Sequence, residues 1–203
     1  MTNNLLIIFT RNPELGKCKT RLASVIGDAA ALDIYTFLIE HTVGITKSLK
    51  VDKQVHYSQN VHHNDLWNDA TYSKKKQEGS DLGERMYFAF KQGFDEGYKN
   101  IIIIGSDIYD LLQRDIETAF TMLEYNNYVL GPAADGGYYL LGMKRLNENI
   151  FRNKNWGTDT VLQDTILDLE AETIAMLDIR NDIDIYEDIK DIAIFKKIIE
   201  KTI

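Results

Sequence analysis

Four positively charged side chains gather in one short stretch near the start of the chain. The stretch is FTRNPELGKCKTRL, residues 9–22, and its cations are Arg11, Lys17, Lys19 and Arg21. Arginine can bind phosphate oxygens through two parallel hydrogen bonds, whereas lysine supplies a point charge. The chain as a whole is acidic, with a formal net charge of −8. A local cluster of cations therefore indicates a site for a small anionic ligand, while the overall charge argues against nucleic-acid binding.

The elements around this stretch predict that the ligand carries phosphate groups. Residues 5–10, LLIIFT, are apolar and predict a buried strand, so the cations follow the carboxyl end of that strand. A helix is expected from about Thr20, and its unpaired amide groups and positive dipole end point into the loop. Gly16 permits close approach of the backbone. The spacing of a Walker A loop is absent, and the alternative is a solvated loop paired with surface carboxylates.

Aspartates occur at two further places that a ligand could reach. Ser106 and Asp107 follow residues 100–105, NIIIIG, whose four consecutive isoleucines predict a strand covered on both faces. Asp182 and Asp184 would point the same way in an extended segment. Mg²⁺ prefers carboxylate and phosphate oxygens, so Asp107 together with one of this pair could bind it. Each has a simpler alternative as a helix cap, which the sequence alone favours for Asp184.

The stretch GPAADGGYYLLG, residues 131–142, places two glycines beside Asp135. The glycines allow unusual backbone angles and leave room for a ligand, although a tight turn is the simpler explanation. Asp135 could accept hydrogen bonds from a substrate hydroxyl or act as a general base. Farther along, Trp156 could stack on a ring, although core packing is more common, and Thr158 is a candidate helix N-cap.

Strands and helices alternate along the chain. Besides the two strands above, strands are expected at 53–58, 72–77, 127–132, 138–143 and 172–178. Helices are expected at 20–48 with an interruption near Gly27, and at 81–96, 113–124, 158–170 and 185–202. This alternation is typical of a three-layer α/β fold that binds ligands at the carboxyl ends of its strands. No linker-like stretch divides the chain, so a single domain over residues 1–203 is expected.

Three features bear on the setting of the protein. The chain has no run of about 18 apolar residues, so no membrane span is expected. Its first residues lack a basic region and a small-residue cleavage site, so no signal peptide is expected. The single cysteine, Cys18, cannot form an internal disulfide, which fits a reducing cytoplasm, and we expect it to be a packing residue.

Six stretches, in this order, resemble one bacterial family of uncharacterised proteins described as glycosyltransferases. They are FTRNPELGKCKTRLA (9–23), QEGSDLGERM (77–86), IGSDIYDL (104–111), GPAADGGYYLLG (131–142), WGTDTV (156–161) and DIDIYEDI (182–189). The family is similar to molybdenum-cofactor guanylyltransferases and phospholactate guanylyltransferase. The resemblance implies a GT-A-like nucleotide-diphospho-sugar transferase fold, in which a mixed, mostly parallel sheet lies between helices.

The resemblance also implies roles for particular residues. The loop from Arg11 to Arg21 would hold nucleotide phosphates, and Asp107 with Asp184, or Asp182, would bind Mg²⁺ or Mn²⁺. Further residues with implied roles lie on two sides of this centre. Those on the nucleotide side are Gly16, Lys17, Lys19, Thr20, Gln77, Gly79 and Arg85, and those on the acceptor side are Asp135, Gly136, Gly137, Trp156 and Thr158.

Three positions depart from the family pattern. Tyr109 replaces a proline, Gly157 replaces a serine, and Ile185 replaces a threonine. Because proline fixes one backbone angle, its loss predicts a looser turn after Asp107.

The predicted function is metal-dependent transfer from a nucleotide-activated donor to a small-molecule acceptor, with glycosyl transfer from a nucleotide-diphospho-sugar as the first hypothesis. Lys17, Lys19 and Arg21 would offset charge on the leaving diphosphate, and Asp135 would deprotonate an acceptor hydroxyl. The alternative is nucleotidyl transfer from a nucleoside triphosphate with release of pyrophosphate. Separation of the carboxylates in the sequence favours this alternative, and the absence of a G-G-x-x-x-R-x-x-x-K loop argues against it. A non-catalytic nucleotide-binding module is a third hypothesis, and the oligomeric state is left open.

Overall fold

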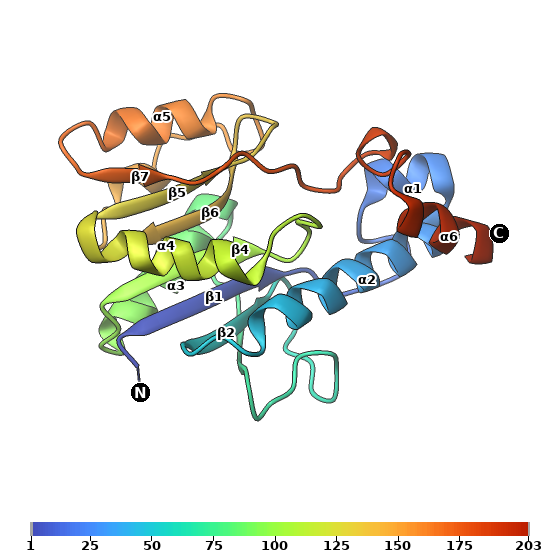
Figure 1. Cartoon of the computed structure of the whole chain (residues 1–203), viewed down its shortest axis with the longest axis horizontal. Coiled ribbons are helices and arrows are strands. Elements are labelled where there is room, and N and C mark those ends of the chain that lie inside the picture. Colours follow the sequence, from blue (N-terminus) through green and yellow to red (C-terminus); the bar gives the residue numbers. More distant parts are fainter. Residues whose placement is uncertain (1, 203) are drawn as a thin grey trace.

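A seven-stranded sheet organises the computed structural model, which describes residues 2–202. Its strands follow the order β3-β2-β1-β4-β6-β5-β7 (Figure 1). They are β1 (Asn4–Thr10), β2 (Asp52–Tyr57), β3 (Ser73–Lys76), β4 (Asn100–Gly105), β5 (Tyr128–Pro132), β6 (Tyr138–Met143) and β7 (Ile174–Met176). Among these strands β6 runs antiparallel to both neighbours, and the other pairings are parallel. The mixed, mostly parallel sheet that the sequence predicted is confirmed.

Helices cover both faces of the sheet, which gives the three-layer arrangement. They are α1 (Thr20–Ile26), α2 (Asp28–Thr46), α3 (Leu82–Asp95), α4 (Gln113–Tyr125), α5 (Val161–Asp168) and α6 (Ala193–Thr202), with short 3₁₀ helices η1 (Asn149–Phe151) and η2 (Tyr186–Asp188). Hydrophobic side chains of α2 and α4 pack on one face, and those of α3 and η1 pack on the other. No described helix is long and apolar enough to cross a membrane.

The apolar runs of the central strands are explained by burial on both faces. In β4, Ile102 and Ile104 pack with the α2 and α4 layer, whereas Ile101 and Ile103 pack with the α3 layer. A strand covered on both sides has no solvent-facing positions, so it shows no alternation of apolar and polar residues.

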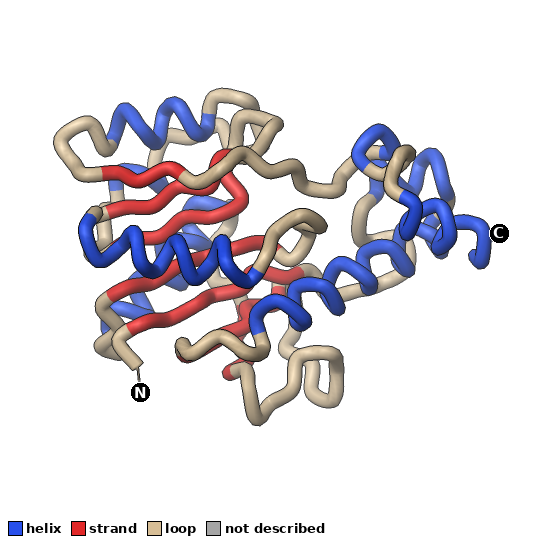
Figure 2. Tube along the Cα trace, viewed as in Figure 1, coloured by secondary structure: helices blue, strands red, loops and turns tan. Residues whose placement is uncertain are grey.

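Four helical segments stand away from the sheet and form what we call the helical lobe. It comprises α1, η2, α6 and the first half of α2, packed around a core of Leu22, Ala31, Ile34, Leu38, Ile183, Ile189 and Phe195. The lobe lies beyond the carboxyl end of β1, and the loop that follows β7 crosses to it (Figures 1 and 2). The break between α1 and α2 falls at Gly27, as expected, where the backbone adopts φ 85°.

The predicted helix over 185–202 is wrong at its start. Residues Tyr186–Asp188 form η2, and α6 begins only at Ala193. The reason is that the Asp188 carboxylate accepts hydrogen bonds from the backbone amides of Asp184 and Ile185, at 2.9 and 2.8 Å, which closes a single turn.

The predicted helix over 158–170 also begins later than expected. The structured helix α5 starts at Val161, with Thr160 at the N-cap position. Thr158 is therefore not the helix cap, because its hydroxyl donates to the carbonyl of Asn155 at 2.8 Å.

Candidate active site

The carboxyl ends of β1 and β4 lie side by side, and they lead into the basic loop and the Asp107 turn. These strands pair in parallel, with Phe9 opposite Gly105, so the basic loop and Asp107 leave the sheet at the same edge. Buried hydroxyls join the two strand ends, because Ser106 Oγ donates to Thr10 Oγ1 at 3.1 Å. Tyr35 Oη, from α2, lies 3.2 Å from each of these two oxygens.

Lys19 connects the basic loop with the aspartates. Its Nζ donates to Asp107 Oδ2 at 2.8 Å and lies 4.0 Å from Asp184 Oδ1. The Lys19 side chain is only 7% exposed, and its backbone adopts a left-handed conformation, φ 49° and ψ 46°. The amide of Ile183 donates to the carbonyl of Asp107 at 3.1 Å, so segments far apart in the sequence meet here. The structure therefore brings Lys19, Asp107 and Asp184 together.

The electrostatics of this cluster keep the lysine charged. Burial lowers the pKa of Lys19, but the charge and hydrogen bond of Asp107, together with the charges of Asp184 and Asp182, outweigh burial and raise the pKa overall. Asp182 behaves differently, because burial, followed by the negative charges of Asp107 and Asp135, raises its pKa to about 6. Asp182 is thus a carboxyl group that takes up a proton more readily than an aspartate free in water.

Other cations of the loop are less well engaged. Arg21 Nη1 donates to Asp184 Oδ2 at 3.1 Å, and its side chain is exposed. Lys17 pairs instead with Glu14 at 2.6 Å, as expected for a solvated charged loop, and Arg11 is exposed. Helix α1, which starts at Thr20, has only seven residues, so the helix dipole that points into the loop is shorter than expected.

The cap alternatives for the two aspartates are wrong. Helix α4 begins at Gln113 with Leu112 at its N-cap, five residues beyond Asp107. Asp184 does not cap α6, because its carboxylate faces the two cations of the basic loop. Both aspartates are therefore free of a structural role in helix capping.

On the nucleotide side, Gln77, Gly79 and Arg85 form one connected unit. The Gln77 amide donates to the carbonyls of His56 at 2.8 Å and of Thr10 at 3.4 Å, and its oxygen accepts from Arg85 Nη1 at 3.4 Å. Arg85 Nε donates to the Gly79 carbonyl at 3.1 Å. The hydrogen-bonding groups of the Gln77 side chain are thus used within the protein, beside the end of β1. What this turn can present to a ligand is therefore its backbone.

Gly79 is a position that only glycine can fill. Its φ is +122°, and a Cβ there would lie 2.7 Å from Glu84 Cβ and 2.8 Å from the Arg85 amide. The turn leads into α3, whose N-cap is Asp81, as predicted; the carboxylate accepts from the Glu84 amide at 2.9 Å.

On the acceptor side, the glycines allow a close approach of two loops. Gly136 has φ +89°, and a Cβ there would lie 2.2 Å from the Asp159 carbonyl oxygen. Asp135 is exposed and accepts from the Gly137 amide at 2.9 Å, which closes the turn. Thr158 is exposed in the neighbouring loop. These loops therefore pack on each other while the Asp135 carboxylate stays accessible.

Trp156 packs against the start of α3 rather than standing free. A Cβ on Gly83 would lie 2.6 Å from Trp156 Nε1, and the indole belongs to the hydrophobic cluster on the α3 face. The simpler alternative, core packing, describes its position.

The turn after Asp107 is held without a proline. Tyr109 packs in the helical lobe, with its ring centroid 5.0 Å from that of Phe195 and 6.0 Å from that of Phe37. Asp110 pairs with Arg180 at 3.4 Å. The looser turn that the sequence predicted is therefore restrained by an aromatic contact and an ion pair.

Sequence reasoning missed two residues that support the site. Arg180 also donates to Asp115 at 2.7 Å, so it ties the Asp107 turn to the segment that carries Asp184. Tyr35, described above, lies among the buried apolar residues of α2, so its type and position did not distinguish it from a packing residue. An arginine two residues before Asp182 was the only available signal, and it is a weak one.

The donor set fits a divalent cation only in part. Within residues 2–202 no group of three or more His, Cys, Asp or Glu side chains is arranged to hold a metal ion. Asp107 and Asp184 face one point, which the Lys19 ammonium occupies. Two carboxylates completed by phosphate oxygens of a bound nucleotide match the preference of Mg²⁺.

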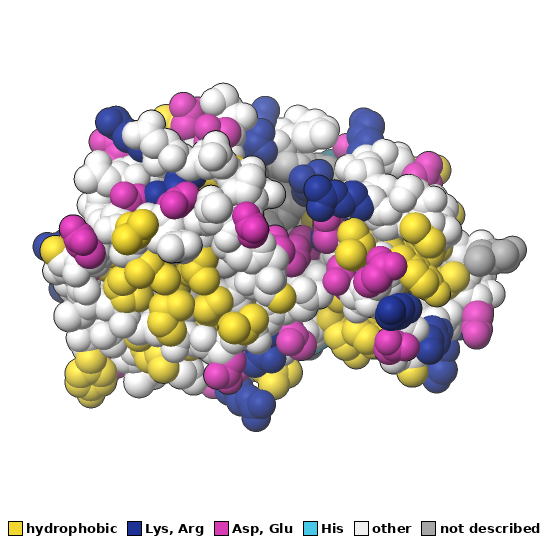
Figure 3. Space-filling model, turned by 90° about the horizontal axis from the view of Figure 1, so that it is seen from above, with side chains coloured by type: hydrophobic (Ala, Val, Ile, Leu, Met, Phe, Trp, Pro, Cys, Tyr) yellow, Lys and Arg dark blue, Asp and Glu magenta, His cyan; other side chains and the backbone are white. Residues whose placement is uncertain are grey.

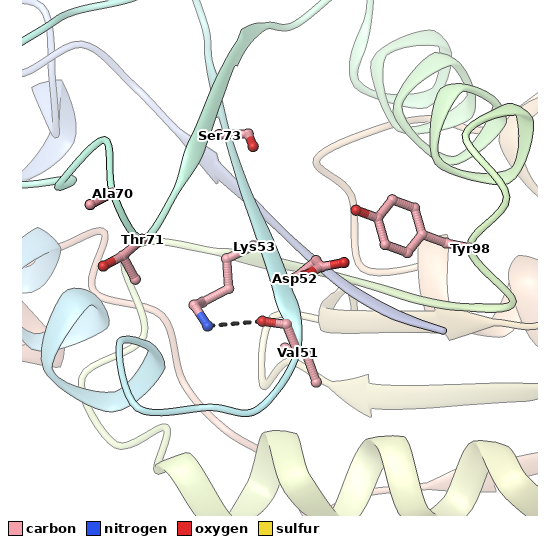
Figure 4. Close-up of a pocket in the computed structure, with 7 residues that line it drawn as sticks. All are labelled: Val51, Asp52, Lys53, Ala70, Thr71, Ser73 and Tyr98. Carbon is pink, nitrogen blue, oxygen red and sulfur yellow. Dashed lines mark hydrogen bonds between the residues drawn. The ribbon is translucent and has the colours of Figure 1, made fainter. Parts of the chain in front are cut away.

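The molecular surface is hollowed between the sheet and the helical lobe, and acidic and basic side chains gather at this hollow (Figure 3). Two further cavities lie elsewhere. One, of about 520 Å³, lies at the amino ends of β2 and β3 and is lined by Val51, Asp52, Lys53, Ala70, Thr71, Ser73 and Tyr98 (Figure 4). The other, of about 490 Å³, lies between η1 and α5. Neither contains a residue of the Lys19 cluster, whose chemistry and strand-end position mark it as the candidate site.

Solved structures share this architecture. A provisionally assigned nucleotide-diphospho-sugar transferase from Desulfovibrio desulfuricans G20 superimposes with a TM-score of 0.87 at 27% sequence identity, covering 99% of this chain and 95% of that one. A cytidylyltransferase from Leptospira borgpetersenii has a TM-score of 0.57 at 14% identity, with 93% and 84% covered. The inositol-1-phosphate CTP transferase from T. maritima has a TM-score of 0.54 at 12% identity, with 98% and 95% covered. The nucleotide-diphospho-sugar transferase fold is therefore confirmed, and the last two structures speak for the fold alone.

The sequence itself points to a bacterial family. No curated protein matches it. The profile of a family described as "Uncharacterized protein conserved in bacteria (DUF2064)" matches residues 42–158, which is more than half of the chain. The resemblance noted in the sequence is thus confirmed, and the chain belongs to this bacterial family.

Proposed function

We propose that the protein is a transferase that acts on a nucleotide-activated donor and moves a sugar from a nucleotide-diphospho-sugar to a small acceptor. The observation that carries the proposal is the contact of Lys19 with Asp107 at the adjoining carboxyl ends of β1 and β4. Ligands of open α/β sheets bind at this edge. The similarity to the Desulfovibrio protein, which is provisionally assigned as a nucleotide-diphospho-sugar transferase, supports the same class.

Each residue of the cluster has a distinct role in this proposal. Lys19, Arg21 and Arg11 bind the phosphates of the donor, with the arginines able to grip oxygens in pairs. Asp107 and Asp184 would hold Mg²⁺ or Mn²⁺, which supplies positive charge to the diphosphate when bound. Asp135, exposed beside the glycine turn, accepts the proton of the acceptor hydroxyl.

The cations of the cluster stabilise the transition state where negative charge builds up. As the bond to the sugar breaks, charge accumulates on the leaving diphosphate, and Lys19 already lies in a nearly buried position. Preorganised charge of this kind is worth about 10²- to 10³-fold in rate per group.

Nucleotidyl transfer is the second candidate. The observation that favours it is that Asp107 and Asp184 come from separate segments, joined through the Ile183 amide, rather than from one tandem motif. In this reaction an acceptor attacks the α-phosphorus of a nucleoside triphosphate, and pyrophosphate leaves. Incubation with triphosphates and candidate acceptors would release pyrophosphate, whereas glycosyl transfer would release a nucleoside diphosphate from a sugar nucleotide.

A thermal-shift screen of nucleotides and sugar nucleotides, with and without Mg²⁺ or Mn²⁺, tests the proposal. A ligand that binds the folded state raises stability by RT ln(1 + [L]/Kd), about 2.7 kcal/mol at 100 Kd. We expect sugar nucleotides to raise the melting temperature, and more so with the cation. No shift with any nucleotide would contradict the proposal. Metal-dependent binding without turnover on a broad acceptor panel would instead indicate a non-catalytic binding module.

A further inference from the structure

The Lys19 ammonium lies where a divalent cation would need to bind. We propose that Lys19 is a built-in counter-ion that competes with the divalent cation for Asp107 and Asp184 and gives way when a nucleotide arrives. The proposal rests on the proposed function in one respect, namely that the two aspartates are the cation's ligands. It adds a property of this chain's own lysine, which can be measured without any turnover.

The contacts of Lys19 show that it occupies the position rather than merely bordering it. Its Nζ lies 2.8 Å from Asp107 Oδ2 and 4.0 Å from Asp184 Oδ1, and the side chain is 7% exposed. Within residues 2–202 the Asp107 carboxylate accepts no hydrogen bond other than that of Lys19. The oxygens that a cation would use are therefore those that the ammonium uses.

Charge makes the two occupants mutually exclusive. Two like charges a few ångströms apart repel strongly in a partly buried environment, so a divalent cation between the aspartates would drive the ammonium away. Removing the ammonium should strengthen cation binding, because Asp107 then loses its counter-charge while the carboxylates of Asp182 and Asp184 remain nearby. The emptied cluster gains affinity for a divalent cation.

A bound nucleotide gives the displaced lysine another partner. The phosphates bring negative charge to the loop that carries Lys19, so the ammonium can leave Asp107 without losing ionic contact. The cation and the nucleotide should thus bind cooperatively in the parent protein, because the phosphates relieve the competition.

A second buried lysine offers a matched control. Lys74 also lies between two aspartates, 2.8 Å from Asp65 and 2.6 Å from Asp69, with a side chain 4% exposed. It belongs to β3, away from the strand ends that form the site. The oxygens of Asp65 are used by other groups, since they accept from the Trp67 amide at 3.0 Å and the Tyr57 hydroxyl at 2.6 Å.

The test is the affinity for Mn²⁺ without nucleotide, measured by electron paramagnetic resonance of free Mn²⁺. We expect Lys19→Met to bind Mn²⁺ at least about tenfold more tightly than the parent, and Lys74→Met to match the parent. Lys19→Gln, which keeps a donor but not the charge, should follow Lys19→Met and covers the case in which the methionine variant does not fold. Adding a nucleoside diphosphate should tighten Mn²⁺ binding in the parent more than in the Lys19 variants.

Three results would overturn the inference. They are unchanged or weaker Mn²⁺ binding in both Lys19 variants, equal gains in the Lys19 and Lys74 variants, and no Mn²⁺ binding by any of the proteins. The proposed function is judged separately by nucleotide binding. A Mn²⁺ gain in the Lys19 variants without nucleotide binding by the parent would support the inference and contradict the proposed function.

Discussion

Replacing Tyr35 by phenylalanine removes one hydroxyl from beneath the candidate site and leaves the aromatic ring in place. The hydroxyl oxygen accepts from the Arg11 amide at 2.8 Å and lies 3.2 Å from both Thr10 Oγ1 and Ser106 Oγ. It therefore joins the first residue of the basic loop to the residue before Asp107. Without it, these two segments lose their shared support.

The magnitude follows from the groups left without a partner. Ser106 and Thr10 keep the bond between them, so the main loss is the partner of the Arg11 amide. An unsatisfied buried donor costs about 1–3 kcal/mol. For a domain of this size, that corresponds to a fall in melting temperature of roughly 2–4 °C for each kcal/mol.

Tyr72→Phe is the matched control for Tyr35→Phe. Its hydroxyl is also buried against α2, where it lies 2.8 Å from Thr46 Oγ1, away from the candidate site. Both variants should lose stability in urea unfolding. Only Tyr35→Phe should also weaken nucleotide binding, measured by calorimetry, because only that hydroxyl positions Arg11 and Asp107. Equal nucleotide affinity in the two variants would refute the reasoning.

Three further predictions concern the surroundings of the site. The pKa of Asp182 is raised to about 6, so the folded state holds this proton more tightly than the unfolded chain does. The stability that this group contributes is therefore lost as the pH rises from about 4 through 6. Asp182→Asn should accordingly have a higher melting temperature than the parent at pH 8 but not at pH 4. Arg180→Met should destabilise the protein by about 3 kcal/mol in urea unfolding, because Asp115 is left largely buried without its partner, and Arg180→Lys should recover part of the loss; an unchanged midpoint for Arg180→Met would contradict this. In urea unfolding, Gly136→Ala should lower the free energy of unfolding by at least about 1 kcal/mol more than Gly27→Ala does. Both glycines have positive φ, but only at position 136 would the new Cβ meet the Asp159 backbone, so equal losses would contradict this prediction.

The sheet could be predicted from the sequence because its pattern is local. Four isoleucines in succession admit few alternatives to a buried strand, and β4 covers the predicted residues 100–105. The end of the chain was predicted less well because a side chain competes with the helix. The Asp188 carboxylate binds two preceding amides, and periodicity of apolar residues gives no sign of that competition.

The candidate site could be predicted only as far as strand ends reveal it. Lys19 and Asp107 were expected together because each follows a central strand, and parallel neighbours share an edge. The residues alone favoured a helix cap for Asp184, because capping by Asp188 could not be foreseen, and only the family resemblance implied a metal-binding role for it. Tyr35 was missed because its partners, Thr10 and Ser106, lie 25 and 71 residues away, and only the fold brings a hydroxyl on an apolar helix face to them.

The central claim is that the basic loop and Asp107 together hold the phosphates of a nucleotide. Calorimetric titration of a nucleoside diphosphate with Mg²⁺ tests it most directly, on the parent, the Lys19→Ala, Arg21→Ala double variant and Lys17→Ala. Lys17 is a suitable control because it lies in the same loop but pairs with Glu14. The account predicts at least about 100-fold weaker binding by the double variant, since two charge-assisted contacts are lost, and little change for Lys17→Ala. A double variant that binds the nucleotide as tightly as the parent would contradict the account.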